Sequence, residues 1–323
     1  MKEVSHNAMR EAAVEAAGEW SLGAVTLRGD LPVSGSPRRS EFRCVVECPD
    51  NQLVVLEAIR RQDRDKKQAV IDRLDFLSRQ GLPGVHPYIR TPDGRQIVRI
   101  RGRLWQASCY VPGKPLNRPG YAFDGWRGEA MADFLINLRK TSRNLPEDIS
   151  TPTFSIQGYV ETLTGRIRVR EPVLFASAVP VIAFLQERLA HVHDLLSVAF
   201  CHGDYHPLNM IWSDDAIQSV IDWEFSGIKP ENYDAATLVG CMGMENPDAL
   251  AGPLVMKFIR TLQESQVFSG SGWSVLVEMI VAIRFAWLAE WLRNRDTEMI
   301  ELETVYMNLL KDNADDLAAL WHC

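Results

Sequence analysis

The sequence predicts an α+β protein with a small antiparallel sheet in an N-terminal lobe and a mostly helical C-terminal lobe. Strand-like segments are concentrated before residue 110, and helical spacing of apolar residues dominates after residue 116. A chain of 323 residues with 46% hydrophobic content is long enough to bury two moderate cores. We therefore expect residues 1–110 to form the first lobe and residues 111–323 the second.

The N-terminal lobe is predicted to combine five strands with two helices. Residues 1–20 lack the uninterrupted apolar core of a signal peptide and read as an amphipathic helix. Residues 66–79 form a second helix with an apolar face, and Gly81 stops it. The strands are expected at residues 23–27, 41–47, 53–59, 96–100 and 104–110.

The C-terminal lobe is predicted to be built from helices. They are expected at residues 126–143, 179–196, 233–241, 253–263, 273–293 and 299–321. The second of these is expected to run almost directly into the loop that follows residue 200. Residues 146–172 read as a proline-punctuated connection that packs over a binding site of this lobe. The apolar run 275–292 is interrupted by three charged residues and reads as a buried helix, which gives no reason to expect a membrane span.

Charge and cysteine content narrow the functional classes. A net charge of −7 and a pI near 5.6 argue against nucleic acid as the main partner. The six cysteines are scattered, and Cys44 and Cys48 have no second pair at the spacing of a zinc site. We expect a reduced, cytoplasmic protein.

Two polar stretches near the middle of the chain carry the chemistry. They are FCHGDYHPLNMIW at residues 200–212 and SVIDWEFSG at residues 219–227. Asp204 and Asn209 are five positions apart, and a hairpin of residues 210–212 with 218–221 would bring Asn209 and Asp222 to one metal ion. Phosphoryl transfer needs such a set: a carboxylate for the acceptor hydroxyl and oxygen ligands for magnesium.

An isolated Asp with an Asn five residues later is common, but the complete loop followed by I-D-W-E is specific. In these motifs the sequence resembles the aminoglycoside phosphotransferase and choline kinase family, which has a protein-kinase-like two-lobe fold. The resemblance implies that Asp204 is the catalytic base and that Asn209 and Asp222 bind Mg²⁺. It also implies that Glu224 contacts a second metal or its water, and that His202 braces the loop or relays a proton.

For two further polar residues of this region, the sequence allows two structural or functional roles each. His206 either positions an acceptor or is a satisfied, partly buried histidine. Asp234 either caps a helix or braces a loop.

The nucleotide site is expected in the N-terminal lobe. The loop at residues 33–39 (VSGSPRR) lies between the first two strands, where proteins of this family cover the nucleotide phosphates. Ser34, Gly35 and Ser36 are therefore predicted phosphate contacts. Residues 105–116 resemble the link between the lobes of this family, which implies that the backbone from Cys109 to Val111 contacts adenine. Backbone contacts are compatible with either ATP or GTP.

One residue departs from the family pattern. Strand 53–59 should carry the lysine that holds the phosphates and pairs with a glutamate on the next helix, but the sequence has Glu57 there. The next helix carries Lys66, Lys67 and Arg73, so the ion pair is reversed in one interpretation. The alternatives are a shifted alignment or a lobe that binds nucleotide poorly.

The acceptor contacts are expected in the last helices. Trp287 and Trp291 are one helical turn apart and form either an aromatic wall for a cationic or sugar-like acceptor or part of the core. Arg284 lies on the same stripe, where it could meet an acceptor carboxylate. Six acidic residues at 298–316 would attract an amine-bearing acceptor or form a solvated face.

We conclude from the sequence that the protein is an ATP- and Mg²⁺-dependent phosphotransferase that moves the γ-phosphate to a hydroxyl of a small metabolite. Aminoglycosides, choline, homoserine and aminosugars are all compatible acceptors. A protein kinase is disfavoured, because Asp222 and Tyr233 are too close for a peptide-binding segment and Gly203 replaces a common arginine. A catalytically weak or non-catalytic nucleotide-binding scaffold, suggested by Glu57, leaves the presence of Asp204 and its metal-binding partners unexplained.

Overall fold

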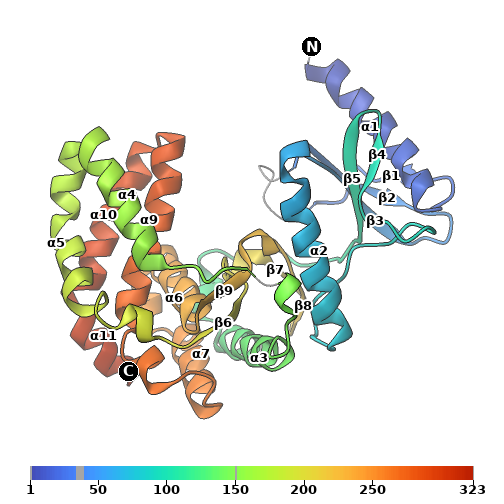
Figure 1. Cartoon of the computed structure of the whole chain (residues 1–323). Coiled ribbons are helices and arrows are strands. Elements are labelled where there is room, and N and C mark those ends of the chain that lie inside the picture. Colours follow the sequence, from blue (N-terminus) through green and yellow to red (C-terminus); the bar gives the residue numbers. More distant parts are fainter. Residues whose placement is uncertain (1, 34–39, 150, 323) are drawn as a thin grey trace. The chain divides into compact units, whose positions relative to one another are not determined.

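The computed structural model describes residues 2–33, 40–149 and 151–322. The chain divides into two compact units (Figure 1). The first unit contains Met1–Pro115, Leu145–Ile149 and Leu208–Glu224, and the second contains Leu116–Asn144, Ser150–Pro207 and Phe225–Cys323. Neither unit is continuous in sequence, unlike the lobes expected at residues 1–110 and 111–323.

The first unit is built on a five-stranded antiparallel sheet in the order β1-β2-β3-β5-β4. Each predicted strand is present, with ends shifted by a few residues. The strands are β1 (Thr26–Leu27), β2 (Phe42–Glu47), β3 (Leu53–Ile59), β4 (Val98–Ile100) and β5 (Arg103–Cys109). The predicted α+β class, with its sheet in the N-terminal region, is confirmed.

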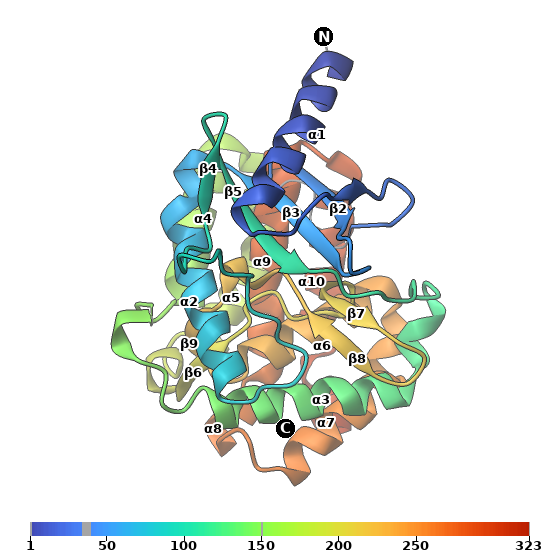
Figure 2. The ribbon, with the colours of Figure 1, turned by 90° about the vertical axis from the view of Figure 1, so that its right-hand side faces the viewer.

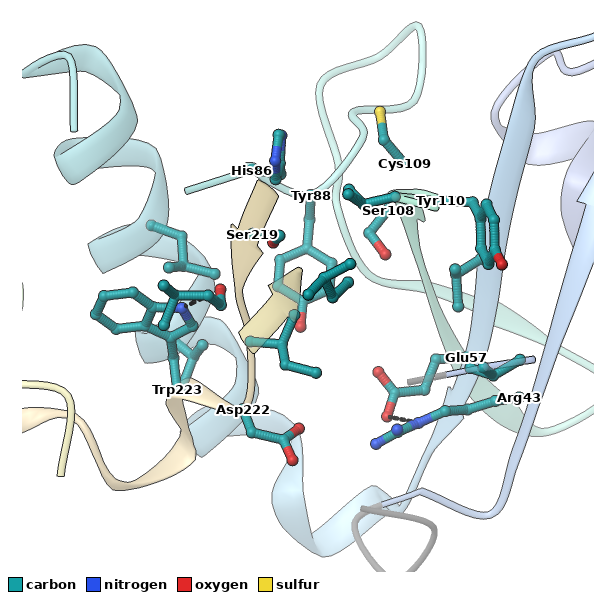
Figure 3. Close-up of a pocket in the computed structure, with 18 of the residues that line it drawn as sticks. Arg43, Glu57, His86, Tyr88, Ser108, Cys109, Tyr110, Ser219, Asp222 and Trp223 are labelled. Carbon is teal, nitrogen blue, oxygen red and sulfur yellow. Dashed lines mark hydrogen bonds and ion pairs between the residues drawn. The ribbon is translucent and has the colours of Figure 1, made fainter. Parts of the chain in front are cut away.

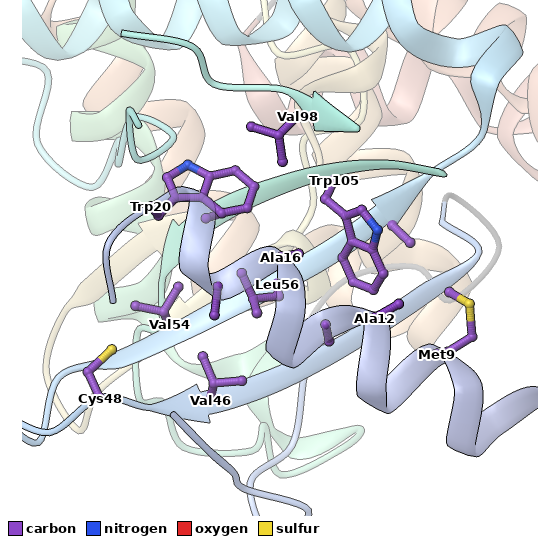
Figure 4. Packing of buried hydrophobic residues seen from close by; sticks show 14 residues of the cluster. Met9, Ala12, Ala16, Trp20, Val46, Cys48, Val54, Leu56, Val98 and Trp105 are labelled. Atoms are coloured by element: carbon purple, nitrogen blue, oxygen red, sulfur yellow. The ribbon is translucent and has the colours of Figure 1, made fainter. Parts of the chain in front are cut away.

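The helix α1 (Lys2–Glu19) covers one face of this sheet (Figures 2 and 4). Its buried alanines pack against Val54, Leu56 and Trp105, and Trp20 follows directly after the helix. Because side chains alternate along a strand, the residues between Val54, Leu56 and Ala58 project to the opposite face. That opposite face carries Val55 and Glu57, which line a pocket.

The second helix of the first unit, α2 (Arg64–Arg79), has the predicted apolar stripe. Val70, Ile71 and Leu77 are buried, and Gly81 adopts a φ of 79° beyond the helix end. A positive φ suits glycine because it has no Cβ, which explains why the helix stops here.

The predicted hairpin is also present in the first unit. Strands β7 (Met210–Trp212) and β8 (Ile217–Val220) pair antiparallel. Val220 N donates to Gly84 O at 2.8 Å, and Lys114 N donates to Trp212 O at 2.8 Å. These backbone bonds explain why residues 208–224 belong to the first unit although they follow much of the second in sequence.

The second unit is mainly helical. Its helices are α3 (Gly125–Thr141), α4 (Ile156–Arg170), α5 (Pro172–Arg188), α6 (Tyr233–Glu245), α7 (Pro253–Glu264), α8 (Gly270–Trp273), α9 (Leu276–Asn294), α10 (Thr297–Asp312) and α11 (Ala314–Trp321). None of the helices in the described ranges combines the length and the hydropathy needed to cross a bilayer.

Three predictions about the second unit are wrong. The connection expected at 146–172 contains helix α4, whose N-cap Ser155 accepts a hydrogen bond from Gly158 N at 3.0 Å. Helix α5 begins with Pro172, a residue favoured in the first helical turn, and ends at Arg188 instead of running into the following loop. The helix expected at 299–321 is interrupted at Asn313.

A two-stranded sheet that the sequence did not predict positions the central loop of the second unit. Strands β6 (Val198–Cys201) and β9 (Gly227–Pro230) pair antiparallel, with Cys201 opposite Gly227. Each strand has four residues, too few for an alternation of apolar and polar residues to be recognised.

The packing of α1 yields a testable prediction. Trp20 is 5% exposed, and its indole nitrogen donates to Ile89 O at 2.9 Å. We expect Trp20→Ala to lower the free energy of unfolding by about 3–5 kcal/mol, because it empties a large volume of the core. Urea unfolding measures this change.

Val14 lies on α1 and is 43% exposed, so Val14→Ala is the matched control and should change stability by less than about 0.5 kcal/mol. Equal unfolding midpoints for the two variants would show that packing of Trp20 does not stabilise the cooperative core.

Candidate functional site

Asp204 lies in a loop of the second unit, residues 202–207, that a buried carboxylate braces. Asp234, near the start of α6, accepts hydrogen bonds from His202 N at 2.7 Å and from Gly203 N at 2.8 Å. Asp234 is 3% exposed, and this burial raises the pKa of its carboxyl group. Of the two roles considered for Asp234, the structure shows the loop brace.

Gly203 meets a backbone requirement of this loop. Its φ is 83°, and a Cβ at this position would clash with the carbonyl oxygen of Phe225. Any larger side chain would therefore displace the loop. This explains why the arginine common in protein kinases is absent here.

Further contacts hold Asp204 from both sides. Asp204 N donates to His202 Nδ1 at 3.2 Å, which is a bracing contact of the kind expected for His202. His206 Nε2 lies 3.5 Å from Asp204 Oδ1. The Tyr205 hydroxyl donates to Met131 O at 2.7 Å, a contact between distant segments that sequence analysis missed.

The carboxylate of Asp204 remains partly accessible. Its side chain is 15% exposed, although the surrounding loop is largely buried. A partly desolvated carboxylate on a braced loop is suited to accept a proton from a bound hydroxyl group.

Two half-buried tryptophans of α9, Trp287 and Trp291, form a surface that we call the tryptophan wall. Their ring centroids are 6.0 Å apart. The ring of His206 packs edge-on against Trp287, also at 6.0 Å. The wall is thus connected to the Asp204 loop within the second unit, and its partial exposure does not match full core packing.

A buried ion pair holds the tryptophan wall in place. Arg284 is 2% exposed and donates to both oxygens of Glu303, with distances of 2.5 and 2.6 Å. The Arg284 guanidinium lies 5.3 Å from the ring of Trp287, and Trp291 Nε1 donates to Glu303 Oε2 at 3.1 Å. The partner of Arg284 is therefore Glu303 of the protein itself, and not the carboxylate of an acceptor that the sequence analysis considered. Glu303 is fully buried, so it does not belong to a solvated acidic face.

The first unit contains a pocket on the sheet face opposite α1 (Figure 3). The predicted adenine contacts Cys109 and Val111 line it, as does the predicted metal ligand Asp222. His86 and Tyr88 also line it and were missed, because they lie in a long segment without periodicity between α2 and β4. The predicted phosphate contacts Ser34, Gly35 and Ser36 lie outside the described residues.

Glu57 is the centre of a charged cluster in this pocket. Its Oε1 lies 3.1 Å from Arg43 Nε and 3.5 Å from Lys67 Nζ, and its Oε2 accepts from Gln106. Lys67 also donates to Glu224 Oε1 at 2.6 Å. The reversed ion pair, one of the interpretations considered from the sequence, is therefore present with Lys67 as its cation.

The other cations considered as partners for Glu57 lie differently. Arg73 donates through Nε to Ile149 O at 2.9 Å, and Lys66 is exposed. Burial by itself would lower the pKa of Lys67, but Tyr88 and the carboxylates of Glu57 and Glu224 outweigh burial and raise it. The ammonium group is therefore charged at neutral pH.

Asn209 and Asp222 flank the β7–β8 hairpin of the first unit. Ile221 N donates to Asn209 O at 2.9 Å, so the backbone joins the two ends of the hairpin. Asp222 has a φ of 66°, which is unusual for a residue with a Cβ and is found at functional sites.

These two residues suit a magnesium ion. Within the described ranges, no group of three or more His, Cys, Asp or Glu side chains could hold a metal. The amide oxygen of Asn209 and the carboxylate of Asp222 are hard donors of the kind Mg²⁺ prefers. Mg²⁺ at nucleotide sites usually takes only one or two protein ligands, with phosphate and water supplying the others.

Comparison with known proteins establishes the family. The model of a phosphotransferase enzyme family matches residues 49–265, more than half of the chain. The chain belongs to this phosphotransferase family. The prediction of a small-molecule phosphotransferase is thereby confirmed at the level of its class. No curated protein matches the chain.

Solved structures show the same fold as this phosphotransferase. A microcompartment-associated aminopropanol kinase aligns with a TM-score of 0.71 at 15% identity, covering 94% of this chain and 97% of that one. A GDP complex of aminoglycoside 2'-phosphotransferase-IIIa gives 0.68 at 16% identity, with 95% and 98% covered. An amicoumacin kinase in complex with AMP-PNP and Ca²⁺ gives 0.67 at 12% identity, with 97% and 96% covered.

The brace of the Asp204 loop can be tested by Asp234→Asn. The amide keeps the shape of the carboxylate but offers one acceptor oxygen instead of two. We expect turnover to fall by about 10- to 100-fold as the loop shifts. The free energy of unfolding should change by less than about 2 kcal/mol, because a neutral amide is easier to bury.

Steady-state kinetics and urea unfolding measure the two effects. Asp194→Asn is the control, since the side chain of Asp194 is 92% exposed. Unchanged turnover in the Asp234 variant would contradict the bracing role.

Proposed function

We propose that the protein transfers the γ-phosphate of ATP to a hydroxyl group of a small metabolite, with Mg²⁺ as the metal. The observation that carries this proposal is the loop that holds Asp204 and is braced by the buried carboxylate of Asp234. Family membership and the nucleotide-bound states of two structural neighbours support it.

The proposal assigns the nucleotide to the pocket of the first unit. The backbone at Cys109 and Val111 would contact the adenine base, and the loop with Ser34, Gly35 and Ser36 would cover the phosphates. Asn209 and Asp222 would hold Mg²⁺. When bound, the metal neutralises charge on the phosphates.

Asp204 is assigned the role of the base. It orients the acceptor hydroxyl and accepts its proton as the oxygen forms a bond to the γ-phosphorus. The bond from this phosphorus to the bridging oxygen breaks, and ADP leaves. Phosphoryl transfer requires little covalent catalysis by the protein. Positioning of the reactants and stabilisation of charge therefore account for most of the rate enhancement.

We further propose that the acceptor lies against the tryptophan wall. Two indole rings fixed beside the Asp204 loop can pack against the ring of a sugar or the cationic group of an amino alcohol. Structural neighbours include a kanamycin complex and an aminopropanol kinase, so both kinds of acceptor occur among them.

The assigned roles of Asp204 and Asp222 predict opposite defects. Asp204→Asn should lower turnover by about 100-fold or more and leave ATP binding nearly unchanged, because it removes the base but no nucleotide contact. Asp222→Ala should abolish Mg²⁺-dependent ATP binding, because it removes the main metal ligand.

Calorimetric titration of ATP with and without Mg²⁺ measures binding, and ADP release with a panel of hydroxylated metabolites measures turnover. The opposite pattern of defects would overturn both assignments. Absence of ATP binding by the wild type at millimolar concentration would instead favour a degenerate kinase fold that serves as a scaffold without bound nucleotide.

The acceptor assignment predicts a selective effect of Trp287→Leu. We expect the KM for the acceptor to rise by about 5- to 30-fold, because stacking on an indole contributes about 1–2 kcal/mol. The KM for ATP should stay within about twofold. Kinetics with aminopropanol, choline, homoserine and kanamycin as acceptors test this.

Trp273→Leu is the matched control, because Trp273 is also half-buried but lies on α8 and packs against Phe268. An equal effect of the two substitutions on acceptor KM would reject the tryptophan wall as the acceptor contact.

A further inference from the structure

The pair of charges between β3 and α2 is transposed in this protein. Kinases hold the nucleotide phosphates with a strand lysine, which a helix glutamate orients. Here the strand carries Glu57 and the helix carries Lys67, and the two side chains form an ion pair at 3.5 Å. Another residue must therefore make the phosphate contact that the strand lysine makes in other kinases.

The strand register excludes a shifted alignment as the explanation. Val54, Leu56 and Ala58 pack against α1, so only Val55 and Glu57 of this stretch point to the pocket. A shift by one residue would place an apolar residue, not a lysine, on the pocket face. The carboxylate of Glu57 therefore occupies the place where a phosphate-binding cation is expected.

Two cations line the described part of the pocket, apart from His86. They are Arg43 on β2, directly opposite Glu57 in the sheet, and Lys67 on α2. Both contact the same oxygen of Glu57, at 3.1 and 3.5 Å. A nucleoside triphosphate is a polyanion, and its binding site requires such cations near the phosphates.

Lys67 is held in place more firmly than a surface lysine. Its side chain is 3% exposed, and it lies between the carboxylates of Glu57 and Glu224. An ammonium group has three N–H donors, so the 2.6 Å bond to Glu224 leaves donor capacity for a phosphate oxygen. A cation fixed in this way loses little side-chain entropy when it binds a ligand.

We propose that Lys67, with Arg43, binds the nucleotide phosphates, and that Glu57 is a positioning residue that holds both cations. The helix α2 thus delivers the charge that a strand normally delivers. This inference rests on the proposed function, because it requires nucleotide in the pocket of the first unit. It explains how a phosphotransferase can work with a glutamate at this position of β3.

The decisive variant is Lys67→Met, which keeps the length of the side chain and removes its charge. We expect the Kd for ATP with Mg²⁺ to rise by about 10- to 100-fold. Adenosine has no phosphate, so its inhibition constant in competition with ATP should change by less than about twofold. Lys67→Arg should restore part of the affinity for ATP, since it keeps the charge.

Lys66→Met is the matched control on the adjacent, exposed lysine and should bind ATP like the wild type. Glu57→Gln should weaken ATP binding less than Lys67→Met, and the loss in the double variant should be smaller than the sum of the two single losses. Such non-additivity is expected if Glu57 acts through Lys67. Arg43→Gln provides the same ATP and adenosine comparison if Lys67→Met does not fold.

The outcomes separate the inference from the function on which it rests. If the wild type binds ATP and Lys67→Met loses affinity for ATP but not for adenosine, the result supports both the proposed function and the role of Lys67. Wild-type binding with an unchanged Lys67→Met variant, or with equal losses for ATP and adenosine, overturns the role of Lys67 alone. If the wild type binds neither ATP nor GTP, the proposed function fails, and this inference fails with it.

Discussion

The constraint on which both candidate sites depend is that a buried carboxylate must have partners. In the second unit Asp234 meets this requirement by accepting two backbone hydrogen bonds, and these bonds fix the course of the Asp204 loop. In the first unit Glu57 meets it by contacting Arg43 and Lys67, and these contacts place two cations in a pocket. In each unit a buried carboxylate therefore positions the proposed functional residues: the Asp204 loop in the second unit, and Lys67 with Arg43 in the first.

The tryptophan wall follows the same principle. Arg284 and Glu303 are both buried, and each would be costly to bury without the other. Once paired, Arg284 lies near the ring of Trp287 and Glu303 bonds the indole nitrogen of Trp291. The pair thereby contacts both partly exposed rings of the tryptophan wall.

Sheet geometry decides which residues of the first unit face its pocket. Strand β3 separates its side chains into an apolar set against α1 and a set that contains Val55 and Glu57. The α1 packing and the pocket are therefore two consequences of one alternating strand. The hairpin of residues 210–220 adds Asp222 to the same unit, although more than a hundred residues separate it from β5.

The sequence alone predicted the elements that depend on local patterns. Alternating strands, the apolar stripe of α2, the β7–β8 hairpin and the family motifs around Asp204 and Asp222 all have a signal within a few residues. Helix α4 and the short β6–β9 sheet lacked such a signal, because the apolar period of the helix is weak and the strands are too short.

Only the tertiary structure decided which distant charges pair. The sequence offered Lys66, Lys67 and Arg73 as partners for Glu57, and it offered an acceptor as the partner of Arg284. Helix rotation and burial select Lys67 in the first case and Glu303 in the second. A sequence records which charges exist, but the free energy of burying them depends on neighbours that only the folded chain brings together.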